Sequence, residues 1–75
     1  MDTAVDNLRI LYVEDDARST EEVRDLAVSR GMQIACEATG AGGLLRAGME
    51  QFDVIILDRM LGDLDGLTII RRLRE

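Results

Sequence analysis

Three short apolar runs, each followed by a segment of helical periodicity, restrict the chain to very few folds. The runs are rich in aliphatic side chains: "LRILYV" at 8–13, "MQIACEA" at 32–38 and "FDVIIL" at 52–57. Runs of this length, bounded by polar or glycine-containing segments, are typical of buried strands. Strands that alternate with helices favour a parallel sheet with helical crossovers. The sequence therefore predicts an α/β fold of βαβαβα order, in which the third strand is covered on both faces.

The segments between and after the runs have the periodicity of amphipathic helices. They are 17–30, with Gly31 as a candidate C-terminal cap, 41–51, and a third helix with Asp65 as a candidate N-cap. Three glycines weaken the second helix by about 1 kcal/mol each relative to alanine. The apolar positions expected to define the inner faces are Val23, Leu26, Ala27 and the stem of Arg30 in the first helix, Leu44, Leu45, Ala47 and Met49 in the second, and Leu67, Ile70 and Leu73 in the third.

Acidic residues follow two of the predicted strands at the point where each strand ends. Glu14, Asp15 and Asp16 follow the first run, and Asp58 follows the third. Ligands of open parallel sheets bind beyond the carboxyl ends of the strands, so we expect three carboxylates to meet in a shallow pocket if these strands are neighbours. Such a cluster raises at least one pKa or binds a cation, and Mg²⁺ prefers oxygen ligands. The alternative is helix capping, which Asp16 could do by itself but which does not explain Asp58.

The side chains that the chain lacks exclude several functions. Fifteen acidic residues outnumber nine basic ones, so we expect no direct binding of nucleic acid by this segment. Histidine is absent, so the chemistry is expected to depend on carboxylates. The single Cys36 cannot form an intramolecular disulfide, and its apolar surroundings predict a buried, reduced thiol. The N-terminus is acidic and no apolar run approaches about 20 residues, so we expect no membrane segment and a cytoplasmic location.

Three separated stretches combine these features: "ILYVEDD", "EATGAGGLLRA" and "DVIILDRMLGDLDGLTIIRRLRE". In their order and separation they resemble the receiver domain of response regulators in two-component signalling, the chemotaxis-regulator type of fold. The resemblance covers essentially the whole chain. It implies a flavodoxin-like fold whose first three strand–helix units form a parallel three-stranded sheet in the order 2-1-3.

The resemblance also assigns roles to the acidic residues. It makes Asp58 the phosphoacceptor, which takes a phosphoryl group from a phosphohistidine on a sensor histidine kinase or a phosphotransfer protein. Glu14 and Asp15 match the acidic pair that holds Mg²⁺, together with the Asp58 carboxylate and the backbone carbonyl of Met60. The Mg²⁺ offsets the negative charge that the phosphoryl oxygens share with the carboxylates. We expect a phosphoprotein of a phosphorelay and not an enzyme.

The chain departs from the family pattern in the loop after Asp58 and in its length. Gly62 stands where the family usually has proline and loosens the loop, whereas Gly66 matches the family's glycine there. The receiver fold has five strand–helix units and this chain supplies three, so we expect 1–75 to form a single truncated receiver domain. The family's hydroxyl residue on the fourth strand and lysine on the fifth are missing, and the chain has no lysine. Truncation is therefore expected to impair switching.

An incomplete sheet predicts association between chains. The third strand would present an apolar edge with unpaired backbone groups, which invites pairing with another chain. We therefore expect a homodimer through this edge. The alternative function is a non-phosphorylated receiver fragment that acts as a self-association or protein-interaction module. Both functions retain the same acidic residues, so Mg²⁺ affinity and oligomeric state are the properties that separate them.

Two further interpretations remain: the first rests on a weak signal, with a plain flexible turn as its alternative, and the second fails on its own motif. The stretch "TGAGG" at 39–43 could hold an anion at a helix N-terminus, but Leu45 replaces the third glycine of a dinucleotide fingerprint. The Gly-Lys pair of a P-loop is also absent. A phosphatase of the haloacid-dehalogenase type pairs its nucleophilic aspartate with a second aspartate two residues later, and here that position is Met60.

Overall fold

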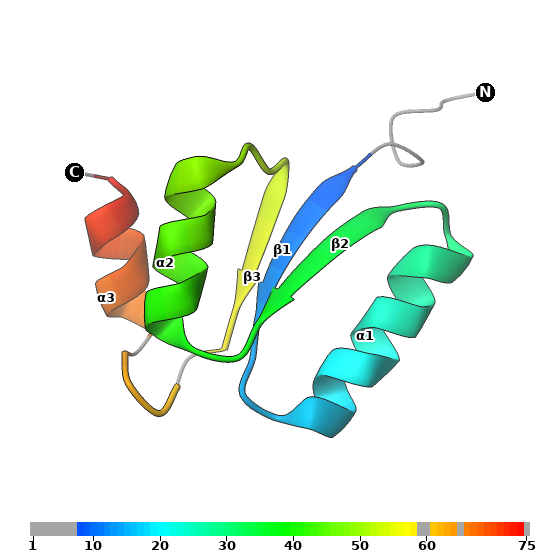
Figure 1. The fold of residues 1–75 in the computed structure, drawn as a ribbon, viewed down its shortest axis with the longest axis horizontal. Helices are drawn as coiled ribbons and strands as arrows, with labels where there is room; N and C mark the ends of the chain where they lie inside the picture. The colour runs from blue at the N-terminus through cyan, green and yellow to red at the C-terminus, as the bar shows by residue number, and fades with distance from the viewer. Residues whose placement is uncertain (1–7, 59–60, 65, 75) are drawn as a thin grey trace.

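The computed structural model describes residues 8–58, 61–64 and 66–74. Strands and helices alternate along the chain (Figure 1): β1 Arg9–Val13, α1 Ala17–Ser29, β2 Gln33–Glu37, α2 Gly40–Met49, β3 Val54–Leu57 and α3 Gly66–Leu73. The three strands form one parallel sheet in the order β2-β1-β3. The predicted α/β fold and strand order are therefore confirmed. Within the described ranges, no helix is long and apolar enough to cross a membrane.

The predicted boundaries are wrong by one or two residues. The strands expected at 8–13, 32–38 and 52–57 are shorter than predicted, and α2 begins one residue before and ends two residues before the predicted 41–51. Gly31 does end α1: its φ of 77° is the left-handed conformation that glycine adopts readily, and its N–H donates to the Val28 carbonyl at 3.1 Å. The proposed cap Asp65 lies outside the described residues.

β1 is the central strand, and it supplies both faces of the sheet with apolar side chains. Leu11 and Val13 alternate with Ile10 and Tyr12 along the strand, so the two pairs point to opposite faces. The chain moves from β1 to β2 on one side and then crosses to β3 on the other. Right-handed crossovers consequently place α1 on one face and α2 on the other. Figure 1 shows α3 beside α2, away from α1.

The main core lies between the sheet and the pair of helices α2 and α3. Its buried members are Leu11, Val13, Leu61 and Ile69. Partly buried side chains pack around them: Ala35, Leu44, Ala47, Phe52, Ile55, Leu57 and Leu64. The glycines of α2 have a packing role here, because a Cβ on the buried Gly43 would lie 2.7 Å from Val13 Cγ2. Gly43 thus lets α2 approach β1 closely, which offsets the helix propensity that it costs.

Several predicted inner positions of the helices are exposed. The exposed fractions are 54% for Leu26, 66% for Leu45, 73% for Met49 and 62% for Leu67. The predicted face of α3 is wrong: Ile69, which the pattern did not select, is 1% exposed and carries the contact with the core. Apolar side chains at helical spacing fit more than one face of a short helix, and packing against Leu61 and Gly40 decides which one is buried.

The prediction that β3 is covered on both faces is also wrong. Ile55 and Leu57 face the core, whereas Val54 and Ile56 are 39% and 41% exposed. Their neighbours on β1, Ile10 and Tyr12, are buried. On the face of the sheet that carries α1, the side chains of β3 are therefore only partly covered. Cys36 is a free thiol and is only half-buried, so the predicted full burial of this side chain is wrong as well.

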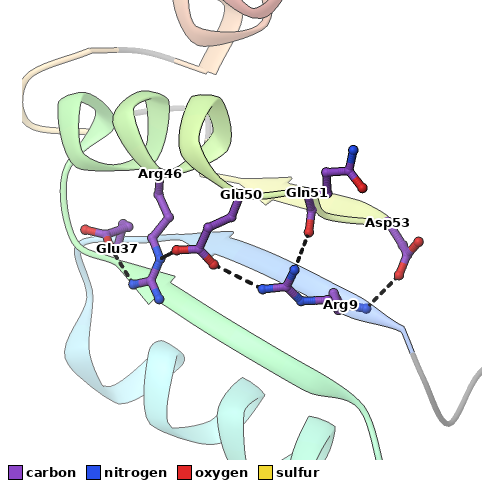
Figure 2. A network of polar contacts seen from close by, with 6 residues as sticks. All are labelled: Arg9, Glu37, Arg46, Glu50, Gln51 and Asp53. Carbon is purple, nitrogen blue, oxygen red and sulfur yellow. Dashed lines mark hydrogen bonds and ion pairs between the residues drawn. The ribbon is translucent and has the colours of Figure 1, made fainter.

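A row of alternating charges runs along one flank of the sheet (Figure 2). Arg46 on α2 pairs with Glu37 at the end of β2, at 3.0 Å, and with Glu50, at 2.9 Å. Glu50 also pairs with Arg9 at 3.1 Å, and the backbone N–H of Arg9 donates to Asp53 at 2.8 Å. All these groups are partly exposed, so each pair contributes little by itself. Together they connect α2 to the end of β2 and to the start of β1.

Candidate metal centre

Two backbone hydrogen bonds fix the positions at which β1 and β3 end. The N–H of Glu14 donates to the Glu37 carbonyl at 3.0 Å, and the N–H of Asp58 donates to the Val13 carbonyl at 2.9 Å. Both residues therefore continue the hydrogen-bond ladder of the sheet by one step. Because parallel strands end at the same edge, their carboxylates start from adjacent backbone positions.

The structure brings three of the predicted site residues together at this edge. Glu14, Asp15 and Asp58 each place one carboxylate oxygen within 4.8 Å of the other two. Glu14 and Asp58 are half-buried, whereas Asp15 is exposed. The fourth predicted ligand, the backbone carbonyl of Met60, lies outside the described residues. Three of the four acids that follow the first and third predicted strands therefore lie together at one edge of the sheet.

The pKa of Glu14 is raised by burial and by the neighbouring acids. Burial raises the pKa of Glu14 above its ordinary value, and the Asp16 N–H opposes this by donating to the carboxylate. A hydrogen bond with Asp58 and the negative charges of Asp58 and Asp15 raise the Glu14 pKa further. Burial likewise raises the pKa of Tyr12, whose hydroxyl donates to Glu14 Oε1 at 3.5 Å, and the Glu14 charge adds to that shift.

The donor set suits a hard divalent cation. The cluster offers carboxylate oxygens and no softer nitrogen or sulfur ligand, which is the chemistry that Mg²⁺ prefers. A cation held there would relieve the repulsion that raises the Glu14 pKa. Glu14, Asp15 and Asp58 are therefore the side chains that could hold Mg²⁺, with an open side at the end of the sheet.

Asp16 has a different task from the three clustered acids. Its carboxylate accepts hydrogen bonds from the Ser19 N–H at 3.2 Å and from the Ser19 hydroxyl at 2.7 Å. These bonds cap α1 and hold the Asp16 pKa below its ordinary value. The capping alternative is thus correct for Asp16, whereas Asp58 lies in the cluster.

Asp63 has a role that no sequence motif indicated. Its carboxylate accepts the N–H groups of Gly40 and Ala41 at the start of α2, at 2.7 and 2.9 Å. This carboxylate occupies the N-terminus at which "TGAGG" might have bound an external anion, so the structure gives no support to that interpretation. Asp63 lies 23 positions after Gly40 and 22 after Ala41 in the sequence, so no local sequence pattern indicates the contact. The general preference of helix N-termini for carboxylates was the one signal available, and it does not say which acid binds which helix.

The fold and the cluster define a class: a parallel α/β protein with a cluster of carboxylates at the carboxyl ends of two neighbouring strands. Within that class, the chain belongs to the family of response regulator receiver domains, whose sequence model matches residues 10–75. The resemblance seen in the sequence is therefore confirmed.

Two relatives illustrate the family. The chain is 42% identical to the transcriptional activator protein PfeR of Pseudomonas aeruginosa over 67 residues, which are 89% of this chain and 22% of PfeR. It is 43% identical to the transcriptional regulatory protein PcoR of Escherichia coli over 67 residues, which are 89% of this chain and 30% of PcoR. The chain thus spans less than a third of these relatives.

Solved receiver domains share the fold. The receiver domain of the Francisella response regulator 1452 matches with a TM-score of 0.87 and 25% identity, over 91% of this chain and 56% of that one. The response regulator TrrA from Thermotoga maritima, determined in complex with Mg²⁺-BeF, matches with a TM-score of 0.84 and 25% identity, over 89% of this chain and 58% of that one. The chain covers somewhat more than half of these structures.

Proposed function

We propose that the chain is a phosphoacceptor receiver domain that takes a phosphoryl group onto Asp58 with the help of Mg²⁺. The observation that carries the proposal is the meeting of Glu14, Asp15 and Asp58 within 4.8 Å at the carboxyl end of the sheet. Membership of the receiver family supports the assignment, and so does the similar TrrA structure in complex with Mg²⁺-BeF. The donor would be a phosphohistidine on a sensor histidine kinase or a phosphotransfer protein.

The proposed reaction uses one side chain of this protein as nucleophile. A carboxylate oxygen of Asp58 attacks the phosphorus, an O–P bond forms, and the P–N bond to the donor imidazole breaks. The imidazole nitrogen keeps the electron pair of that bond and takes a proton from solvent. Bound Mg²⁺ would supply positive charge that offsets the charge of the phosphoryl oxygens and the carboxylates. The product is an acyl phosphate on the protein itself, so we propose that the chain is a phosphorylated partner and not an enzyme.

The position of Asp58 at the end of a strand suits this role. Its backbone is held by the hydrogen bond to Val13, next to a strand whose Leu11 and Val13 are fully buried. A nucleophile on such a support loses little of its orientation when the donor approaches. The backbone of Glu14 is held in the same way by the Glu37 carbonyl, so both carboxylates extend from backbone positions that the sheet fixes.

Phosphorylation is tested with a small phosphodonor and intact-mass analysis under conditions that preserve an acyl phosphate. The wild-type chain is expected to gain one phosphoryl group in the presence of Mg²⁺ and none after chelation. Asp58→Asn is expected to gain none, because the amide is not a nucleophile. Asp53→Asn is the matched control: it removes an exposed acid that flanks the same strand at its other end, and it should leave the gain intact.

Two outcomes would contradict the proposed function. One is an equal mass gain in Asp58→Asn, which would place the phosphoryl group elsewhere. The other is no gain in the wild-type chain while circular dichroism shows native helix content.

The second candidate function is self-association through β3. The observation that favours it is the open position of this strand: in the described sheet β3 pairs with β1, and Val54 and Ile56 are 39% and 41% exposed. An edge strand with unpaired backbone groups and apolar side chains is a site for pairing with a second copy. We therefore propose a homodimer through the β3 edge.

Self-association is measured by sedimentation equilibrium over a range of protein concentrations. Ile56→Lys is expected to shift the population from dimer to monomer, because a lysine on the strand places a charge against the partner's apolar surface. Leu45→Lys is the control, since it introduces the same charge at an exposed position on α2 and not on β3. A wild-type chain that sediments as a monomer at all concentrations would contradict the proposed dimer.

A further inference from the structure

The loop that follows Asp58 is fastened to a helix from another part of the chain. Asp63 Oδ1 accepts the N–H of Gly40 at 2.7 Å, and Asp63 Oδ2 accepts the N–H of Ala41 at 2.9 Å. Oδ1 also accepts the N–H of Leu64 at 2.9 Å. Both oxygens of the carboxylate are therefore used, and they connect the β3–α3 loop to the first turn of α2.

The loop and the helix also pack against each other without room for another carbon. A Cβ on the buried Gly40 would lie 2.7 Å from Leu64 Cβ and 3.2 Å from Ile69 Cδ1. Leu61, on the other side of Gly62, is 9% exposed and belongs to the main core. The loop is thus held at two places, by the core at Leu61 and by α2 at Asp63.

Electrostatics favour the same contact. The first N–H groups of a helix have no partner within the helix and carry partial positive charge, so a carboxylate is stabilised there. The Ala41 and Gly40 N–H groups hold the pKa of Asp63 below its ordinary value. Thr39 caps the same helix independently, because its hydroxyl oxygen accepts the N–H of Gly42 at 3.0 Å. The helix start is therefore capped by one local residue and by one residue of the loop.

Gly62, the residue before Asp63, does not itself restrict the loop. A Cβ at Gly62 would meet nothing within 4 Å, so its surroundings do not restrict it, and it stands where the resemblance expects a proline that would fix the backbone. Asp63, the next residue, then limits the freedom of the loop by binding α2. A loop ordered in this way keeps Leu61 in the core beside Val13, whose carbonyl accepts the Asp58 N–H.

We propose that Asp63 is a positioning residue for the metal site: by fastening the β3–α3 loop to α2, it sets the Mg²⁺ affinity of the cluster formed by Glu14, Asp15 and Asp58. The inference rests on the proposed function, because it concerns the same Mg²⁺. Asp63 acts through the packing of the loop: its carboxylate binds the N–H groups of Gly40, Ala41 and Leu64.

The test is a Mg²⁺ titration of the full chain followed through Tyr12. Tyr12 is the single tyrosine, tryptophan is absent, and the Tyr12 hydroxyl contacts Glu14, so its fluorescence reports on the cluster. Asp63→Ala is expected to raise the Mg²⁺ concentration at half-saturation about tenfold, the lower end of what loss of an outer-shell partner costs. The extent of Asp58 phosphorylation at saturating Mg²⁺ should remain that of the wild type. Asp63→Asn keeps an acceptor oxygen, so its Mg²⁺ concentration at half-saturation is expected to lie between those of the wild type and Asp63→Ala.

Thr39→Ala is the matched control, because it removes the other cap of the same helix without touching the loop. It is expected to lower the melting temperature while leaving the Mg²⁺ half-saturation unchanged. A shift as large in Thr39→Ala as in Asp63→Ala would mean that loss of helix stability causes the effect, and would overturn the inference.

The remaining outcomes separate the two proposals. If the wild-type chain binds Mg²⁺ and both Asp63 variants bind it equally well, the inference is wrong and the proposed function stands. If the wild-type chain neither responds to Mg²⁺ nor gains a phosphoryl group, the proposed function fails and the inference fails with it. Circular dichroism of each variant checks that the fold is retained.

Discussion

Leu11→Ala is expected to lower the free energy of unfolding by about 2–5 kcal/mol, the range for truncating a buried leucine. Leu11 is 0% exposed, lies on the central strand and packs in the main core. Domains of this size have a total stability of roughly 4–11 kcal/mol, so the variant would lose a large share of it. The measurement is urea unfolding followed by far-ultraviolet circular dichroism, with the loss read from the shifted midpoint.

Leu45→Ala is the control for that experiment. The chemical change is the same, but Leu45 is 66% exposed on α2, and alanine is at least as good a helix former. The expected change is within about 0.5 kcal/mol. Equal losses in the two variants would mean that the core lies elsewhere than between the sheet and α2.

Mg²⁺ is expected to reverse the stability order of the wild-type chain and Asp58→Asn. Without Mg²⁺ the variant should be the more stable, because the Asp58 charge is one of the causes that raise the Glu14 pKa. A raised carboxyl pKa means that the folded state disfavours the ionised form, so removing a neighbouring charge favours folding at neutral pH. At about one hundred times its dissociation constant, Mg²⁺ should stabilise the wild type by about 2.7 kcal/mol and the variant by less.

Thermal unfolding with excess chelator and with excess Mg²⁺ measures this reversal. Asp25→Asn, an exposed position on α1, carries the same change of charge away from the cluster and should keep the full Mg²⁺ gain. An equal Mg²⁺ gain in Asp58→Asn would show that Asp58 is not a ligand.

The order of the elements could be predicted because it depends on short-range patterns. Each apolar run is bounded by polar residues or glycine, and the parallel sheet in the order β2-β1-β3 follows the resemblance. The orientation of the helices could not be predicted in the same way. Ile69 is buried in place of Leu67 because the close approach of α3 to Gly40 selects one face, and that approach is a tertiary contact.

The residues at and around the candidate site also fall into a predictable group and an unpredictable one. Glu14, Asp15 and Asp58 were predictable because the ends of neighbouring parallel strands must lie at one edge. Asp63 was not, because its partners Gly40 and Ala41 are brought to it only when α3 and α2 pack side by side. Contacts that depend on the packing of two helices leave no periodic trace in the sequence.

The charge row along α2 has a consequence for how ligands reach the site. Its two arginines, Arg9 and Arg46, nearly cancel its three acids, Glu37, Glu50 and Asp53, so the formal net charge of −6 falls mostly on the remainder of the chain. An uncompensated negative field attracts a divalent cation and repels an anionic phosphodonor, and dissolved salt screens both effects. If the proposed function holds, rising ionic strength should therefore slow the encounter with Mg²⁺ and speed the encounter with the donor.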